Sequence, residues 1–187
     1  MNSEEEMLND ARAHMDKSLD ILRRELSTVR TGRANPALIE HIHVDYYGAP
    51  TPLLQLATIS SPEPRQLIVQ PYDRSATGSI EKAIRSSDLG LNPANEGTLI
   101  RIVIPQLTEE RRRDLVKVVH KRTEEAKVSI RNVRRDEMDR LKKLRKDKQI
   151  SEDEASVVEE ALQKLTDRYI KEADTIGQAK EQEMLEV

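Results

Sequence analysis

The sequence predicts an α+β protein: an elongated antiparallel three-helix bundle with an inserted small mixed α/β domain. All eight prolines and five of the six glycines lie between residues 32 and 105. The two flanks are rich in Leu, Glu, Lys and Arg, which favour helices. We therefore assign residues 1–30 and 106–187 to the bundle and residues 31–105 to the inserted domain.

The first predicted helix has one apolar face and ends near residue 30. Its apolar residues recur at helical spacing; they are Leu8, Met15, Leu19, Leu22, Leu26 and Val29. The segment that follows contains Gly32 and Pro36, which are expected to end the helix.

The inserted domain predicts several strands and one short helix. The alternating Ile42, Val44 and Tyr46 are typical of a half-buried strand. Further strands are expected at residues 53–59, 67–69 and 99–104, a turn at 48–52 and a helix at 79–87.

The second flank predicts two long helices. Val119, Ile130 and Leu141 are eleven residues apart, which is close to three turns of a straight helix. This helix is expected at residues 109–148. Another is expected after Ser151, which has the spacing of a capping box with Glu154. Three antiparallel helices would bury all three apolar faces together.

The order of these elements predicts a two-domain, L- or V-shaped molecule with a hinge. The chain leaves the bundle where the first helix ends and returns where the second begins, so both connections lie at one end. Gly32 and Pro105 mark these connections. We expect the hinge there.

The composition argues against several classes of protein. The chain has no cysteine, so a disulfide framework, a thiolate metal site and a cysteine nucleophile are excluded. It has no run of about 18 apolar residues, and its acidic start does not resemble a signal peptide. We expect a soluble, cytoplasmic monomer.

No residue pattern is typical of a catalytic centre. The sequence lacks a glycine-rich phosphate loop, a supported Ser/His/Asp arrangement and zinc-ligand spacing. His41 and His43 could share one strand face, but without further ligands nearby they are better explained as solvated polar residues. We expect no enzyme activity, no cofactor and no metal.

The charges are strongly segregated along the chain. Residues 107–150 have 16 Lys and Arg against 9 Asp and Glu, and residues 151–187 have 4 against 11. At about 100° per residue, the cations of the second helix gather on one side, away from its apolar face. This arginine stripe consists of His120, Lys127, Arg131, Arg134, Arg135, Lys142 and Arg145. Arg131 has no acidic residue three or four positions away, so we expect it to be unpaired within its helix.

Two interpretations of the arginine stripe remain open at this point. The acidic third helix could neutralise it within the molecule. Alternatively it binds phosphates, whose oxygens match the arginine guanidinium. The scarcity of aromatic residues disfavours base stacking on a single strand, so the RNA would be structured and recognised by its backbone and shape.

Seven segments, in one order along nearly the whole chain, form a family pattern. They are residues 30–34 (RTGRA), 46–53 (YYGAPTPL), 80–84 (IEKAI), 87–93 (SDLGLNP), 107–112 (LTEERR), 131–136 (RNVRRD) and 147–153 (DKQISED). With this pattern the sequence resembles the ribosome recycling factor family. The resemblance implies the L-shaped two-domain fold. It also implies a factor that binds the post-termination ribosome and, with elongation factor G and GTP, splits it into subunits.

The resemblance also implies which residues act. The bundle would bind large-subunit rRNA through Arg131 and Arg134, with Arg112. To these the arginine stripe adds Arg135 and Lys127 as rRNA-binding candidates.

The hinge implied by the family motif contains Gly32 and Arg33, with Arg30 just before them. The connections add Thr31 and Pro105. The GTP would be hydrolysed by the partner and not by this chain.

Two alternative functions follow from the residues alone: a non-enzymatic helical adaptor and a general structured-RNA-binding protein. Phosphate binding predicts a steep salt dependence, and a protein-binding adaptor does not. A general RNA binder would need no GTPase.

Overall fold

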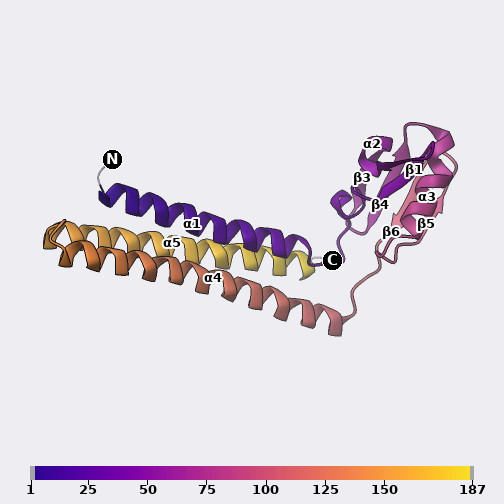
Figure 1. Cartoon of the computed structure of the whole chain (residues 1–187). Coiled ribbons are helices and arrows are strands. Elements are labelled where there is room, and N and C mark those ends of the chain that lie inside the picture. Colours follow the sequence, from indigo (N-terminus) through magenta and orange to yellow (C-terminus); the bar gives the residue numbers. More distant parts are fainter. Residues whose placement is uncertain (1–2, 186–187) are drawn as a thin grey trace. The chain divides into compact units, whose positions relative to one another are not determined.

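The computed structural model describes residues 3–185, which fall into two compact units. One unit contains the chain up to Arg30 together with Glu110–Gln182, and the other contains Thr31–Glu109 and the residues from Glu183. Helices α1 (Ser3–Ser27), α4 (Glu109–Lys146) and α5 (Glu152–Leu185) build the first unit (Figure 1). The predicted α+β class, with a long helical bundle and a small sheet domain, is confirmed.

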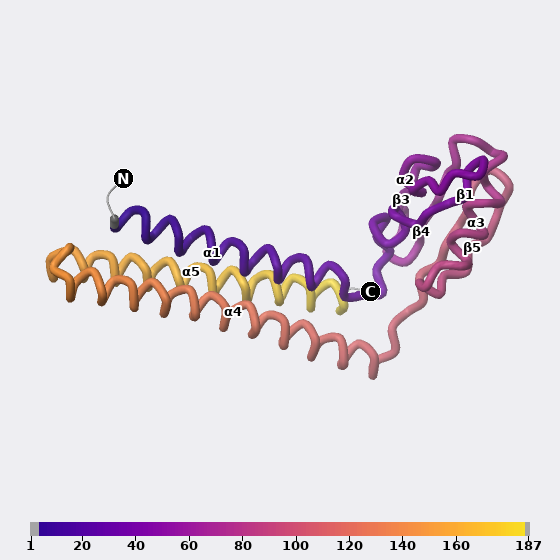
Figure 2. The backbone as a smooth tube through the Cα atoms, viewed as in Figure 1, coloured from indigo at the N-terminus to yellow at the C-terminus, as the bar shows by residue number. Residues whose placement is uncertain are grey.

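The three bundle helices lie along one another, with α4 antiparallel to α1 and α5 (Figure 2). Val119, Ile130 and Leu141 are at most 4% exposed, as their spacing predicts. Because α4 has 38 residues, it is roughly 57 Å long, and the bundle core is a long apolar seam. The capping box of α5 is also confirmed. The Glu154 amide donates to Ser151 Oγ at 3.1 Å, and the Ser151 amide donates to Glu154 Oε2 at 2.8 Å.

The apolar face of α1 is rotated slightly from the predicted one. Met15, Leu19, Leu22 and Leu26 are buried as expected. Met7 and Ala11 are also fully buried, whereas Leu8 is half-buried. A seven-residue spacing does not decide which of two adjacent apolar residues points inward.

Three close contacts join the bundle helices in pairs. A Cβ added at Gly177 of α5 would lie 2.5 Å from Thr123 Oγ1 of α4, so the two helices approach this closely only because residue 177 has no side chain. Ser18 of α1 and Ser129 of α4 share a hydrogen bond of 2.8 Å. The hydroxyl of buried Tyr169 donates to Asp16 and so links α5 to α1.

The second unit contains two antiparallel sheets. Strands β3 (Ala57–Glu63), β4 (Gln66–Pro71), β6 (Ile100–Val103) and β5 (Pro93–Asn95) form the larger sheet in that spatial order. Strands β1 (His43–Tyr46) and β2 (Ala49–Pro52) form a hairpin. Helix α3 (Thr77–Arg85) contacts β1 and β5. Short 3-10 helices occupy Pro36–Leu38 and Arg74–Ala76.

The strand predicted at residues 53–59 is wrong in its first half. Residues Leu53–Leu56 form the short helix α2, and β3 begins only at Ala57. Leu53 and Leu56 are both buried; three residues apart, they share a helix face but would point to opposite faces of a strand. The segment expected to be a turn forms β2, and β5 was not predicted.

Candidate nucleic-acid interface

Acidic side chains lie close to most residues of the arginine stripe. His120, Lys127 and Arg145 reach Glu181, Asp174 and Glu152 of α5 at 3.1, 3.0 and 3.5 Å. Lys142 lies 3.6 Å from Asp139 within α4. The interpretation that acidic residues of the third helix pair with the basic second helix is therefore correct for part of the stripe.

Lys127 is the clearest case of internal pairing. Its side chain is only 19% exposed, and Nζ lies 3.0 Å from Asp174 Oδ1 and 3.5 Å from Glu124 Oε2. The hydrogen bond to Asp174 raises the pKa of Lys127 above its ordinary value. Lys127 therefore joins α4 to α5, and it could contact a phosphate only by giving up this pair.

The expectation that Arg131 is unpaired within its helix is wrong. Its Nη1 donates to Glu124 Oε1 at 3.1 Å, and this hydrogen bond is the main reason that the pKa of Glu124 is lowered. Glu124 lies seven positions earlier, two helical turns away, beyond the neighbours that the sequence argument considered. The side chains are 47% and 57% exposed, so the pair is worth about 0–1 kcal/mol.

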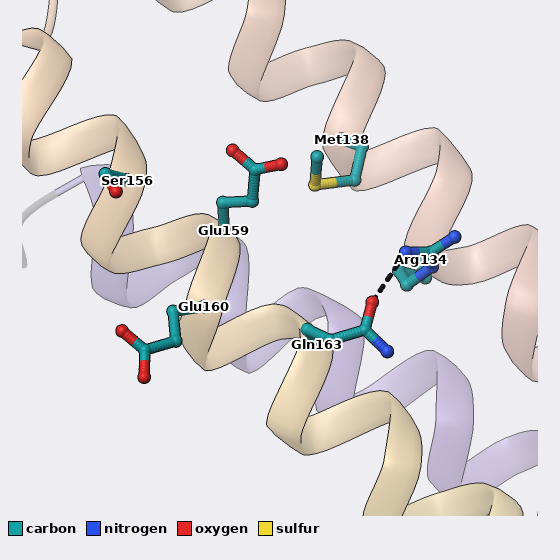
Figure 3. A pocket seen from close by; sticks show the side chains of 6 residues that line it. All are labelled: Arg134, Met138, Ser156, Glu159, Glu160 and Gln163. Atoms are coloured by element: carbon teal, nitrogen blue, oxygen red, sulfur yellow. Dashed lines mark hydrogen bonds between the residues drawn. The ribbon is translucent and has the colours of Figure 1, made fainter.

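Arg134 is held from α5 by a neutral residue. Its Nη1 donates to Gln163 Oε1 at 2.6 Å (Figure 3). Gln163 Nε2 donates in turn to Asp167 Oδ1 at 2.9 Å. An amide acceptor orients the guanidinium without neutralising it. Arg134 thus keeps its charge in a fixed position.

Arg135 is the exposed neighbour of Arg134. Among the described residues it makes no hydrogen bond or ion pair. Arg131, Arg134 and Arg135 together form a cationic surface on α4, which we call the α4 arginine cluster.

Arg112 does not belong to this cluster. It lies 19 positions before Arg131, which places it roughly 28 Å along the helix and about 100° around it. Arg112 is half-buried, and its Nε is buried without a hydrogen-bond partner among the described residues.

A groove between α4 and α5 lies beside Arg134 and has a volume of about 310 Å³. The residues that line it are Arg134, Met138, Ser156, Glu159, Glu160 and Gln163 (Figure 3). Sequence reasoning missed its four α5 residues, since nothing in the chain indicates which turns of α5 face Arg134.

The predicted hinge residues lie in irregular backbone. Thr31 and Gly32 are buried, while Arg30 and Arg33 are exposed. Gly32 has a φ of +77°, and a Cβ there would lie 3.3 Å from Leu107 Cγ. The two connections therefore meet at Gly32 and Leu107, and Pro105 is exposed close by in the sequence.

Neither a metal cluster nor a membrane span is found within residues 3–185. No group of three or more His, Asp or Glu side chains there is placed to hold a metal. None of the helices described combines the length and hydropathy needed to cross a bilayer.

Comparison with known proteins relates the whole chain to one family. The family model for ribosome recycling factor matches residues 22–185. The ribosome-recycling factor of Thermomicrobium roseum is 56% identical over 183 residues, which is 98% of this chain and 99% of the relative. That of Halalkalibacterium halodurans is 58% identical over 182 residues, 97% of this chain and 98% of the relative.

Solved structures of the same family also match this chain. A solution structure of the ribosome recycling factor matches with a TM-score of 0.77 and 45% identity, and it covers all of both chains. A second match has a TM-score of 0.65 and 53% identity over 97% of this chain and 98% of the other. It comes from models for the T. thermophilus ribosome recycling factor and E. coli elongation factor G bound to the E. coli post-termination complex.

Proposed function

Because the chain belongs to the ribosome recycling factor family, we propose that it binds the post-termination ribosome and splits it into subunits for reuse. Elongation factor G and GTP act with it in this reaction. The observation that most supports this function is identity of 56% and 58% to named recycling factors over 98% and 97% of the chain. We place GTP hydrolysis on elongation factor G, which makes this chain a non-enzymatic cytoplasmic factor without a cofactor.

The α4 arginine cluster is our proposed contact with large-subunit rRNA. Arg135 has no partner within residues 3–185, Arg134 is oriented by a neutral amide, and Arg131 has one exposed pair that a phosphate can replace. Lys127 supports the cluster indirectly. It also contacts the Glu124 carboxylate and so competes with Arg131 for that carboxylate. Arg112 would act at a separate point near the start of α4.

In this proposal the bundle docks as one stiff body, and Arg30–Arg33 with Pro105 form the hinge. Elongation factor G would displace the second unit, and the rigid helices would transmit the force to contacts between the subunits. Long helices that share one apolar seam resist bending, which a force-transmitting element requires.

We expect the Arg131→Ala/Arg134→Ala double variant to fold and to lose ribosome splitting. Each lost charge-assisted contact should cost on the order of 1–3 kcal/mol of affinity for the large subunit. The slope of log affinity against log salt should become shallower by about 2. Light scattering of post-termination ribosomes with elongation factor G and GTP measures splitting.

The matched control is Lys17→Ala/Lys171→Ala. It removes the same charge from exposed lysines of α1 and α5 whose side chains have no partner among the described residues. The control should split ribosomes normally. Equal affinity of the arginine double variant and the control would exclude the cluster from rRNA binding, and the helical adaptor would become the better hypothesis.

A further inference from the structure

The groove between α4 and α5 contains a cation and an anion that do not pair with each other. Arg134 donates to Gln163 at one end, while the Glu159 carboxylate extends from α5 toward Met138 (Figure 3). Glu159 makes no hydrogen bond or ion pair with any described residue. The space between the two groups can therefore take a ligand that has both acceptors and donors.

A phosphate backbone alone does not suit this groove. A free carboxylate repels phosphates, so Glu159 would weaken RNA binding if the contact were purely electrostatic. The neighbouring Glu160 differs, because its carboxylate is bound to Lys164 at 2.8 Å and points away from α4 (Figure 3). Glu159 thus leaves a carboxylate acceptor available in the groove that Arg134 also lines.

We propose that this groove is a subsite for an unpaired guanine base of the ribosomal RNA, an inference that rests on the proposed function. Guanine presents the acceptors O6 and N7, which arginine binds with two N–H groups. Its N1–H and N2–H₂ donate from the adjacent edge, and a carboxylate can accept both. Adenine and uracil lack this combination, and cytosine offers a carboxylate only its amino group.

The walls of the groove fit a flat base. Met138 contributes a polarisable thioether, which contacts aromatic faces favourably. The volume of about 310 Å³ lies at the lower end of small-molecule pockets, so the groove has room for one base. Unpaired bases in loops and bulges are the groups that proteins most often bind specifically in RNA.

Gln163 completes the arrangement by fixing one side of the guanidinium. It accepts one N–H of Arg134, while Asp167 accepts from its own amide. The guanidinium has five N–H donors, so the others stay available for O6, N7 or a phosphate of the same nucleotide.

Glu159→Gln tests the subsite. A guanine contact predicts that this variant binds the large subunit more weakly, and a purely phosphate contact predicts that it binds more tightly. If Glu159 accepts from guanine, this variant binds the large subunit about tenfold more weakly, which corresponds to about 1.4 kcal/mol. If Glu159 only faces phosphates, removing its charge tightens binding. The matched control Glu160→Gln removes the same charge from the adjacent residue and should bind equally well or more tightly.

Arg134→Ala is measured beside these variants at the same salt concentration, with circular dichroism to verify folding. Weaker binding by Arg134→Ala with unchanged or tighter binding by Glu159→Gln would overturn the guanine subsite and leave the proposed function intact. Unchanged binding by Arg134→Ala would instead argue against the docking surface itself.

Base selectivity is tested with GMP and AMP as probes. The full chain with a ¹³C-labelled Met138 methyl group should show a resonance shift on titration with millimolar GMP and a much smaller one with AMP. Glu159→Gln should abolish the difference. Equal shifts with the two nucleotides, or none, would overturn the assignment of guanine.

Discussion

Glu137 is a carboxylate buried where α4 packs against α1. Its side chain is 11% exposed, its Oε2 has no hydrogen-bond partner in the part of the chain that the structure describes, and Arg140 Nη1 lies 3.6 Å away. Burial raises the pKa of Glu137, opposed by the charge of Arg140; Asp10 raises this pKa as well, and His14 lowers it. The folded protein therefore binds a proton at this residue more readily than the unfolded chain does.

We expect Glu137→Gln to stabilise the protein at neutral pH. The raised pKa means that stability falls as pH increases from the unfolded value, about 4.3, through the folded value. A neutral Gln avoids this loss, so the variant should have a higher Tm at pH 7. Each 1 kcal/mol gained in the free energy of unfolding raises Tm by about 2–4 °C. Near pH 4 the Tm of the variant should equal that of the unchanged protein. Thermal melts at both pH values, with exposed Glu5→Gln as the control, measure this. An equal gain at both pH values would contradict the protonation argument.

For the rRNA-binding candidates, the residue pattern predicted the face of the helix but not the partners of the side chains. Helical spacing placed Arg131, Arg134 and Arg135 on one side of α4, as the structure does. It could not find Glu124 as the partner of Arg131, because an arginine side chain reaches across two helical turns, beyond the residues three and four positions away. The contacts of Arg134 with Gln163 and of Lys127 with Asp174 depend on the register between two helices, which the pattern of a single helix does not contain.

At the scale of elements, α4 and α5 pack closely at Thr123 and Gly177. We expect Gly177→Ala to destabilise the bundle by about 1–3 kcal/mol, as overpacking does, because the new Cβ would lie 2.5 Å from Thr123 Oγ1. In an exposed helix the same change would stabilise, since Ala is the better helix former. Chemical denaturation measures the difference.

A second variant separates steric overlap from other causes. Thr123→Ala/Gly177→Ala removes Oγ1 and Cγ2, the two closest atoms, and leaves the Cβ contact of 3.4 Å. The double variant should therefore recover most of the stability that Gly177→Ala loses. A double variant less stable than Gly177→Ala would show that the overlap is not the cause.

The long helices were predictable, and so were the short elements β1, β4, β6 and α3, whereas α2, β2 and β5 were not. An eleven-residue spacing repeated over α4 fixes a helix and its buried face at once. By contrast, β2 contains Pro50 and Pro52, and prolines in a segment argue for a turn. It pairs with β1 alone, where an edge position tolerates them. Such pairing depends on the fold and not on the local sequence.

At the scale of the whole molecule, the hinge is the prediction still to be measured. The chain has no cysteine, so Gln55→Cys in the second unit and Asp153→Cys in the bundle would be unique labelling sites. Single-molecule energy transfer between dyes at these sites should give a broad or multiple distance distribution. One narrow distribution in every condition would contradict a mobile hinge.

The insertion of one unit into the other has a consequence for how the chain is made. Residues Thr31–Glu109 are almost all of the second unit, so this unit can fold as soon as that contiguous stretch has left the ribosomal exit tunnel. Helix α1 is synthesised first, yet its apolar face can be buried only after α4 and α5 have been synthesised. During each round of synthesis the apolar residues of α1 therefore have no bundle partner until α4 and α5 have been made, whereas the contiguous second unit has nearly all of its residues earlier.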